Sequence, residues 1–123
     1  MRPSSVVVLE QDASIAGVLV PSLKNHFETV GVANSPSDLR VEVAKRRATL
    51  VILDLENAGV AEVRELRENF PQTSIVCTHR LADEQMWAEV LAAGAADLCD
   101  ASDFASIIRS AVIQSKFVQS AAA

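Results

Sequence analysis

The chain contains 123 residues, half of them hydrophobic, and carries a net charge of −5. This length corresponds to one domain that is large enough to bury a core. The negative charge argues against a nucleic-acid surface, and no apolar run reaches the roughly 20 residues of a membrane-spanning helix. Residues 1–4 lead directly into a strand pattern without a signal peptide. We therefore expect a cytoplasmic domain that contacts neither nucleic acid nor membrane.

Strand and helix patterns alternate along the whole chain. Each short apolar run typical of a strand is followed by a segment whose apolar residues recur with helical spacing. We expect one domain over residues 4–119, followed by a frayed tail at residues 120–123. The expected strands cover residues 5–9, 28–33, 49–54, 73–77 and 96–99, and the expected helices cover residues 12–26, 35–47, 61–69, 83–93 and 103–119.

The run at residues 49–54, Thr-Leu-Val-Ile-Leu-Asp, is the centre of this pattern. A β-branched apolar run of this kind is typical of a strand buried on both faces of a parallel sheet. Five strand–helix units with short connections predict a doubly wound, five-stranded parallel α/β sheet, with helices on both faces because crossovers are right-handed. We expect strand order 2-1-3-4-5, which places the first and third strands side by side.

Polar residues follow three of the predicted strands. Asp54 ends the third strand, the run Glu10, Gln11 and Asp12 follows the first, and Thr78 follows the fourth. Because open parallel sheets bind ligands beyond the carboxyl ends of their strands, these groups should share one rim. Each of these residues also has a simpler possible role. Asp54 can be an ordinary strand end or helix cap, Asp12 can cap the first helix, and the only role of Thr78 can be a hydrogen bond to a backbone group.

The sequence argues against several other classes of protein. A dinucleotide binder needs a glycine-rich or hydroxyl-rich loop after its first strand, whereas Glu-Gln-Asp there would repel phosphate without a metal. A nucleophilic hydrolase needs a base beside its nucleophile, and His26 and His79 offer no such pairing. Cys77 and Cys99 lie in apolar strand patterns, where they are either buried reduced thiols or a redox pair on neighbouring strands.

The order and spacing of the polar residues resemble a response-regulator receiver domain of two-component signalling, with its CheY-like fold. The similarity covers residues 6–112 and rests on several motifs together, since no single one is specific. The matching positions are Glu10, Gln11 and the adjacent Asp12 for the family's acidic pair, Asp54 for its phosphorylated aspartate, Thr78 for its hydroxyl residue, and residues 94–98 for the Gly-Ala segment before its fifth strand.

The resemblance implies a phosphorelay signalling domain and not an enzyme. Asp54 would be the phosphoacceptor, Thr78 would contact the phosphate, and no residue would be catalytic. The implied partner is a sensor histidine kinase or another signalling protein. The implied ligands of a weakly bound Mg²⁺ are Glu10, Asp12, Asp54 and Glu56, the last through its carbonyl oxygen.

The sequence departs from the family pattern at positions that carry charge or the conformational switch. The family's Lys-Pro falls on Ala101 and Ser102, and its aromatic switch residue falls on Leu98. Gln11 replaces one carboxylate, and the loop at residues 55–60 is short and lacks Met-Pro. Arg80 is the only nearby cation that can substitute for the lysine; the alternative is a solvated surface arginine.

Two functions therefore stay open. One is a receiver that accepts phosphate on Asp54, and the other is a pseudo-receiver that has lost the switch and binds other proteins. In the family, the face of the fourth helix, fifth strand and fifth helix commonly carries contacts, so we expect a homodimer through it. Trp87 is either a half-buried core residue or an anchor in a partner surface. The face would include Trp87, Glu89, Arg109, Gln114 and Lys116, with Phe117 and Val118 extending it.

Overall fold

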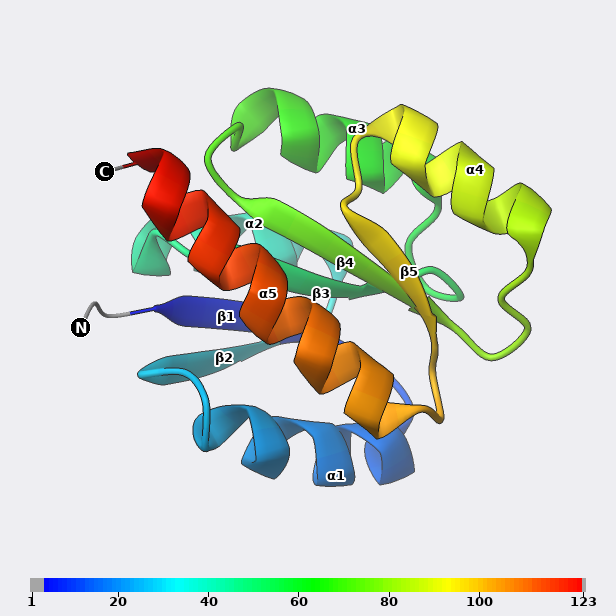
Figure 1. Ribbon diagram of the computed structural model, residues 1–123, viewed down its shortest axis with the longest axis horizontal. Helices are drawn as coiled ribbons and strands as arrows, with labels where there is room; N and C mark the ends of the chain where they lie inside the picture. Colours follow the sequence, from blue (N-terminus) through cyan, green and yellow to red (C-terminus); the bar gives the residue numbers. More distant parts are fainter. Residues whose placement is uncertain (1–3, 123) are drawn as a thin grey trace.

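A parallel sheet between two layers of helices forms the protein (Figure 1). The computed structural model describes residues 4–122 of the chain, and the side chains up to residue 116. Every strand expected from the sequence is present, with bounds shifted by at most two residues. The strands are β1 (Ser5–Leu9), β2 (Thr29–Ala33), β3 (Leu50–Asp54), β4 (Ser74–His79) and β5 (Asp97–Asp100).

The five expected helices are also present. They are α1 (Ala13–Lys24), α2 (Pro36–Arg46), α3 (Val60–Asn69), α4 (Glu84–Ala93) and α5 (Phe104–Ala122). The last helix continues past residue 119, so the part of the expected frayed tail that the structure describes is helical, and Ala123 lies outside the described residues. Within residues 4–122, no helix is long and apolar enough to cross a membrane.

The sheet has the strand order β2-β1-β3-β4-β5, and all of its pairs are parallel. The predicted fold class and strand order are therefore confirmed. All five residues of β3 are buried, as expected for a central strand with helices on both faces. Because every strand runs in the same direction, the residues after β1, β3 and β4 meet at one edge of the sheet.

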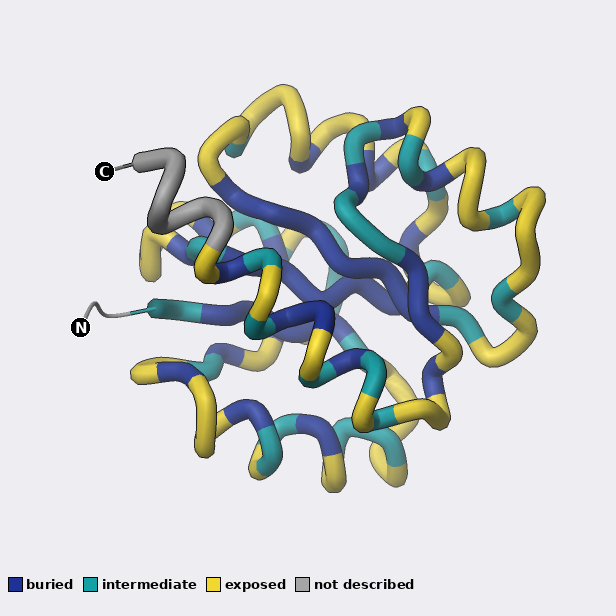
Figure 2. Tube along the Cα trace, viewed as in Figure 1, coloured by how far each residue is buried: buried dark blue, intermediate teal, exposed yellow. Residues whose placement is uncertain are grey.

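Each face of the sheet buries its own core. Helices α1 and α5 cover one face, and α2, α3 and α4 cover the other (Figure 1). Successive strand residues alternate between the two cores, as the pleat of a strand requires. The strands consequently form the buried centre of the molecule in Figure 2. The α1/α5 core contains Val8, Ile52, Val76, Leu19, Leu23 and Ile107, and the other core contains Leu9, Leu53, Cys77, Leu39, Val63 and Val90.

Local signals set the ends of the helices. The side chains of Asp12, Ser35 and Asp83 cap α1, α2 and α4 by accepting hydrogen bonds from amides of the first turn. Gly94 ends α4 with a φ of 115°, a backbone conformation that glycine adopts without strain. The cap that the sequence allowed at Asp12 is therefore confirmed.

The two cysteines lie on neighbouring strands but on opposite faces of the sheet. Cys77 pairs in register with Leu98, and Cys99 pairs with Thr78. Cys77 belongs to the core under α2, α3 and α4, whereas Cys99 belongs to the core under α1 and α5. Both are buried and unbridged. The interpretation as two reduced thiols is confirmed, and the redox pair is wrong because the pleat points the two thiols apart.

Candidate functional site

Asp54 ends the central strand and is buried among polar neighbours. Its exposed fraction is 3%, and it pairs in register with Thr78 on β4. On the other side, Leu9 of β1 pairs with Leu53 of β3. The residues that come next in the chain, Glu10 and Asp54, therefore also lie next to each other. The acidic run after β1 and Thr78 after β4, which the sequence placed on the same rim as Asp54, thus lie on either side of it.

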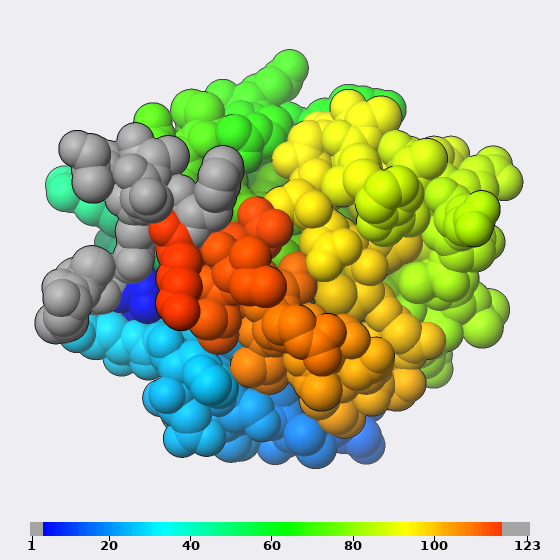
Figure 3. Space-filling view, in the orientation of Figure 1, coloured from blue at the N-terminus to red at the C-terminus, as the bar shows by residue number. Residues whose placement is uncertain are grey.

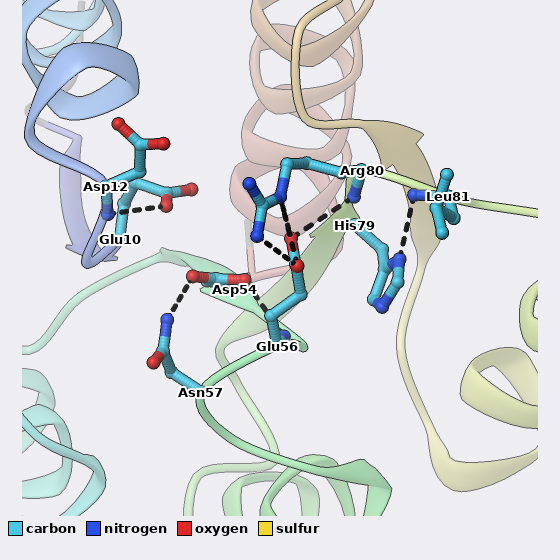
Figure 4. A network of polar contacts seen from close by, with 8 residues as sticks. All are labelled: Glu10, Asp12, Asp54, Glu56, Asn57, His79, Arg80 and Leu81. Carbon is cyan, nitrogen blue, oxygen red and sulfur yellow. Dashed lines mark hydrogen bonds and ion pairs between the residues drawn. The ribbon is translucent and has the colours of Figure 1, made fainter.

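A tight turn after β3 holds the Asp54 carboxylate. Its Oδ1 accepts a hydrogen bond of 2.9 Å from the Glu56 amide, and its Oδ2 accepts one from the Asn57 side chain (Figure 4). The Asn57 and Ala58 amides both donate to the Asp54 carbonyl at 3.1 Å. Sequence reasoning missed Asn57, although an asparagine three residues after a strand-ending aspartate is a turn signal.

Thr78 lies beside Asp54 with an unpaired hydroxyl. Its exposed fraction is 1%, and its Oγ1 has no hydrogen-bond partner among the described residues. Thr78 and Asp54 each lie two residues beyond a residue of the α1/α5 core, Val76 and Ile52, so both side chains face the same side of the sheet. A buried hydroxyl without a partner costs free energy, and an anionic oxygen at this place would accept its hydrogen bond.

The acidic run after β1 divides into different roles. Asp12 caps α1, because its Oδ1 accepts hydrogen bonds from the Ser14 and Ile15 amides at 2.8 and 3.3 Å. The Asp12 amide in turn donates to Glu10 Oε2 at 3.1 Å. Gln11 donates through Nε2 to the Asn34 carbonyl on the adjacent loop at 3.5 Å. The capping role that the sequence allowed for Asp12 is therefore confirmed.

Negative charge is crowded at this edge of the sheet. The pKa of Glu10 is raised to about 7, chiefly by burial and to a smaller extent by the neighbouring Asp54 and Asp12. The hydrogen bond from the Asp12 amide opposes this shift in the pKa of Glu10. Glu10, Asp12 and Asp54 line one cavity, and carboxylates gathered in this way favour the approach of a cation.

Arg80 enters the site from the loop after β4 and pairs with Glu56. Its Nε donates to Oε1 and Oε2 of Glu56 at 3.0 and 3.1 Å, and its Nη2 donates to Oε1 at 2.9 Å (Figure 4). The Arg80 amide also donates to Glu56 Oε2 at 3.3 Å. These bonds lower the pKa of Glu56 and raise the pKa of Arg80. Arg80 is thus ion-paired, although 64% of its side chain is exposed.

These groups surround one cavity of about 370 Å³. Its lining is predominantly polar and acidic, and Arg80 is its one basic residue among those the structure describes. Thr78 is not part of this lining and lies beneath it, next to Asp54. The lining residues are Glu10, Gln11, Asp12, Ile15, Asp54, Glu56, Asn57 and Arg80.

The donor set of the cavity suits Mg²⁺ better than a softer metal. As the side chains stand, the described residues contain no group of three histidine, cysteine or carboxylate side chains placed to hold one metal ion. Mg²⁺ is commonly bound through only one or two carboxylates, with water as the other ligands. The carboxylates of Glu10, Asp12 and Asp54, which line one cavity, fit that requirement.

The end of β5 provides no charge to this site. Leu98 and Ala101, which stand where the resemblance expects an aromatic residue and a lysine, are 9% and 2% exposed. His79 accepts a hydrogen bond from the Leu81 amide through Nδ1, at 2.9 Å. His79 is therefore the last residue of β4 and holds the turn that follows it. Arg80 is left as the one cation in the described lining of the cavity.

The predicted contact face lies beside this edge of the sheet. Helix α4, strand β5 and helix α5 form one continuous surface (Figure 3). The Trp87 side chain is on this face and is 48% exposed, where it lines a shallow hollow of about 320 Å³ with Leu98. Glu89, Arg109 and Lys116 are exposed and Gln114 is half-buried, whereas the side chains of Phe117 and Val118 lie outside the described residues.

The comparison with known proteins gives a consistent result for the fold. No protein-family model and no curated protein matches the sequence. The structure is similar to a signal receiver domain from Vibrio parahaemolyticus, with a TM-score of 0.85 and 16% identity over 96% of this chain and 94% of that one. It is also similar to the N-terminal signal receiver domain of a two-component response regulator from Bacteroides fragilis, with a TM-score of 0.82 and 19% identity over 93% and 98% of the two chains.

A Francisella response-regulator receiver domain gives a TM-score of 0.81 at 17% identity, over 93% of this chain and 98% of that one. The fold is therefore that of response-regulator receiver domains, the CheY-like class of doubly wound α/β proteins. In this chain the fold carries a buried aspartate at the end of β3, which is the position that the sequence resemblance singled out.

Proposed function

We propose that the chain is a receiver domain that accepts a phosphoryl group on Asp54. The observation that carries this proposal is the pairing of a buried carboxylate with a buried, unpartnered hydroxyl. Asp54 and Thr78 occupy paired positions on β3 and β4, and Thr78 Oγ1 has no partner among the described residues. A phosphoryl oxygen on Asp54 would provide the missing acceptor.

The transfer is a nucleophilic substitution at phosphorus. An Asp54 carboxylate oxygen attacks the phosphorus of the donor, and the bond from phosphorus to the leaving group breaks. With a small acyl phosphate, the carboxylate of the donor leaves with the electron pair and no proton is needed. With a phosphorylated histidine of a sensor kinase, the imidazole leaves and takes up a proton. Such transfers depend mainly on positioning and on neutralisation of charge.

The chain's own residues supply the positioning. The Glu56 amide and the Asn57 side chain hold the Asp54 carboxylate, and the Thr78 hydroxyl would donate to a phosphoryl oxygen. Glu10, Asp12 and Asp54, with the Glu56 carbonyl, would hold Mg²⁺. When bound, this ion neutralises charge on the carboxylates and the phosphoryl oxygens. We expect weak binding, because Gln11 provides no charge.

A pseudo-receiver is the second candidate. It is favoured by the buried, apolar Ala101 and Leu98, which replace the lysine and aromatic residue that the resemblance expects. In that case the domain would act only by binding other proteins, through the face that contains Trp87 and Arg109. NMR shifts at Asp12 and Asp54 on addition of millimolar Mg²⁺ separate the two candidates, because a module without the site has no reason to bind the ion.

Incubation with a small acyl phosphate and Mg²⁺, followed by measurement of the intact mass, tests the proposal. The native chain should gain one phosphoryl group, and Asp54→Asn should gain none. A gain in mass that survives Asp54→Asn would overturn the assignment of the acceptor. A native chain that never gains mass would favour the pseudo-receiver.

The proposed partners follow from the same assignment. A cytoplasmic sensor histidine kinase would donate the phosphoryl group, and a second copy of the chain would bind through the surface of α4, β5 and α5. The half-exposed Trp87 supports this choice of surface, because an aromatic side chain on a polar surface is a common centre of protein contacts.

A further inference from the structure

A phosphoryl group on Asp54 would add about two negative charges to an edge that is already acidic. Glu10, Asp12 and Glu56 line the same cavity as Asp54. Neutralisation therefore needs a cation from the protein in addition to any metal ion. The end of β5 offers Ala101 and no basic side chain.

Arg80 is placed to provide that cation. It is the one basic residue among the described residues that line the cavity, and the charges of Asp12 and Asp54 contribute to the raised pKa of its guanidinium, after the larger effect of Glu56. Figure 4 shows the Arg80 side chain reaching back from the end of β4 over Glu56 and toward Asp54.

Glu56 connects Arg80 to the acceptor. The Glu56 amide donates to Asp54 Oδ1 at 2.9 Å, while the carboxylate of the same residue accepts hydrogen bonds from the Arg80 guanidinium and amide. Glu56 is therefore the single residue that links the Asp54 carboxylate to the Arg80 guanidinium. A phosphoryl group on Asp54 would form beside the Glu56 carboxylate and compete with it for the guanidinium.

Basic residues elsewhere are placed for other roles. Arg67 donates to the carbonyl oxygens of Pro71 and Thr73, and Arg40 pairs with Glu62 between α2 and α3. Arg109 lines a different cavity, next to Asp97 and Asp103. None of these three arginines lines the cavity at Asp54.

We propose that Arg80 exchanges the Glu56 carboxylate for the phosphoryl group on Asp54, and so takes the place of the absent lysine. The inference rests on the proposed phosphorylation of Asp54. The exchange is inexpensive because exposed ion pairs are weak, and 64% of the Arg80 side chain is exposed. A guanidinium forms two parallel hydrogen bonds with phosphate oxygens as readily as with a carboxylate. Arg80 can therefore replace its bonds to Glu56 with equivalent bonds to a phosphoryl group.

The exchange would also release a connection between two loops. The Arg80–Glu56 ion pair joins the loop after β3 to the loop after β4, and the loop after β4 leads into α4. Loss of the ion pair would leave only the hydrogen bond from the Arg80 amide, at 3.3 Å. Phosphorylation would thus change how the start of α4 is held without any aromatic switch residue.

The rate of phosphorylation by an acyl phosphate with Mg²⁺ tests this role. Arg80→Ala should slow the gain of mass about tenfold, which corresponds to the loss of one charge-assisted hydrogen bond, and Arg80→Lys should restore part of the rate. Glu56→Gln should speed the reaction, because it removes the charged competitor. The control is Arg64→Ala, which removes the same charge from an exposed position on α3.

A second readout follows the guanidinium directly. The Arg80 Nε–H signal in ¹⁵N NMR should shift when the native chain is phosphorylated, and should not shift in Asp54→Asn. If Arg80→Ala reacts as fast as Arg64→Ala while Asp54→Asn does not react, the role of Arg80 is overturned and the phosphoacceptor stands. If the native chain gains no phosphoryl group, the proposed function fails and this inference fails with it.

Discussion

Asp54 and Thr78 face the same side of the sheet from paired positions on β3 and β4. This relationship follows from strand pairing and not from a shared motif, since the two residues are far apart in the sequence. The strands that bring them together are almost entirely buried, so the geometry of the pair is fixed by the core. The Leu55 amide, which donates to the Thr78 carbonyl at 3.0 Å, joins the two strand ends further.

Replacement of Thr78 should separate stability from phosphorylation. Thr78→Val removes a buried hydroxyl that has no partner among the described residues, so the free energy of unfolding should stay the same or rise by up to about 1 kcal/mol. The rate of phosphorylation should fall about tenfold, because a hydrogen bond to the phosphoryl group is lost. Thr78→Ser keeps the hydroxyl and should keep most of the rate. Urea unfolding and intact-mass kinetics measure the two effects, and a Thr78→Val chain that reacts normally would contradict the role of Thr78.

Replacing the two partners of the ion pair between Arg40 and Glu62 should reduce the free energy of unfolding by unequal amounts. Glu62 is nearly buried, with 9% of its side chain exposed, whereas 34% of the Arg40 side chain is exposed. Arg40→Met leaves a buried carboxylate unpaired and should cost about 2 kcal/mol of unfolding free energy. Glu62→Met leaves an arginine that water and Glu65 can reach, and should cost less than about 1 kcal/mol. Urea unfolding with Arg64→Met as the control measures this, and equal losses would contradict the asymmetry.

The two thiols should be unreactive in the folded protein. Burial raises the pKa of Cys77 to about 12 and that of Cys99 to about 11, so at pH 8 almost no thiolate is present. A chromogenic disulfide reagent should label neither thiol in the folded chain and both in urea. If the folded chain is left with the reagent for a long time, Cys99 should react before Cys77, because Cys99 borders the cavity between β5 and α5. Cys77→Ala and Cys99→Ala identify the order, and rapid labelling of Cys77 in the folded chain would contradict its burial.

Trp87 should be the centre of the contact face if the chain dimerises through it. Truncation of a central aromatic residue typically costs about 2 kcal/mol or more, so Trp87→Ala should weaken a dimer roughly 30-fold. The control is Val41→Ala, since Val41 is a similarly exposed apolar residue, 59% exposed, on α2. Sedimentation of the three chains measures the effect. A monomer at all accessible concentrations, or a dimer that Trp87→Ala leaves unchanged, would contradict the face.

Much of the fold was predictable from local patterns. The buried run that ends in Asp54 indicated a central parallel strand, and Asp12 indicated the start of the first helix. Right-handed crossovers predicted helices on both faces, whereas the strand order was chosen as a common one for this class of sheet. The end of α5 was not predictable, because Ser120 and the alanines after it carry no stop signal such as glycine or proline.

The site was predictable only in part. The sequence placed Asp54, Glu10 and Thr78 on one rim because each follows a strand. It did not indicate that Arg80 pairs with Glu56, since that contact joins two loops whose shapes depend on the finished sheet. It also did not separate the cysteines, because the face of each thiol depends on its position in the pleat.

Location of the phosphoryl group on the chain tests the central claim most directly. Reduction with borohydride converts an aspartyl phosphate to homoserine, and peptide sequencing by mass spectrometry then identifies the position. After treatment with acyl phosphate and Mg²⁺, the account predicts that the conversion occurs at Asp54 alone. Homoserine at Asp12, the corresponding five-carbon alcohol at Glu10, or no reduction in a chain that is shown to be folded would contradict the assignment of Asp54 as the phosphoacceptor.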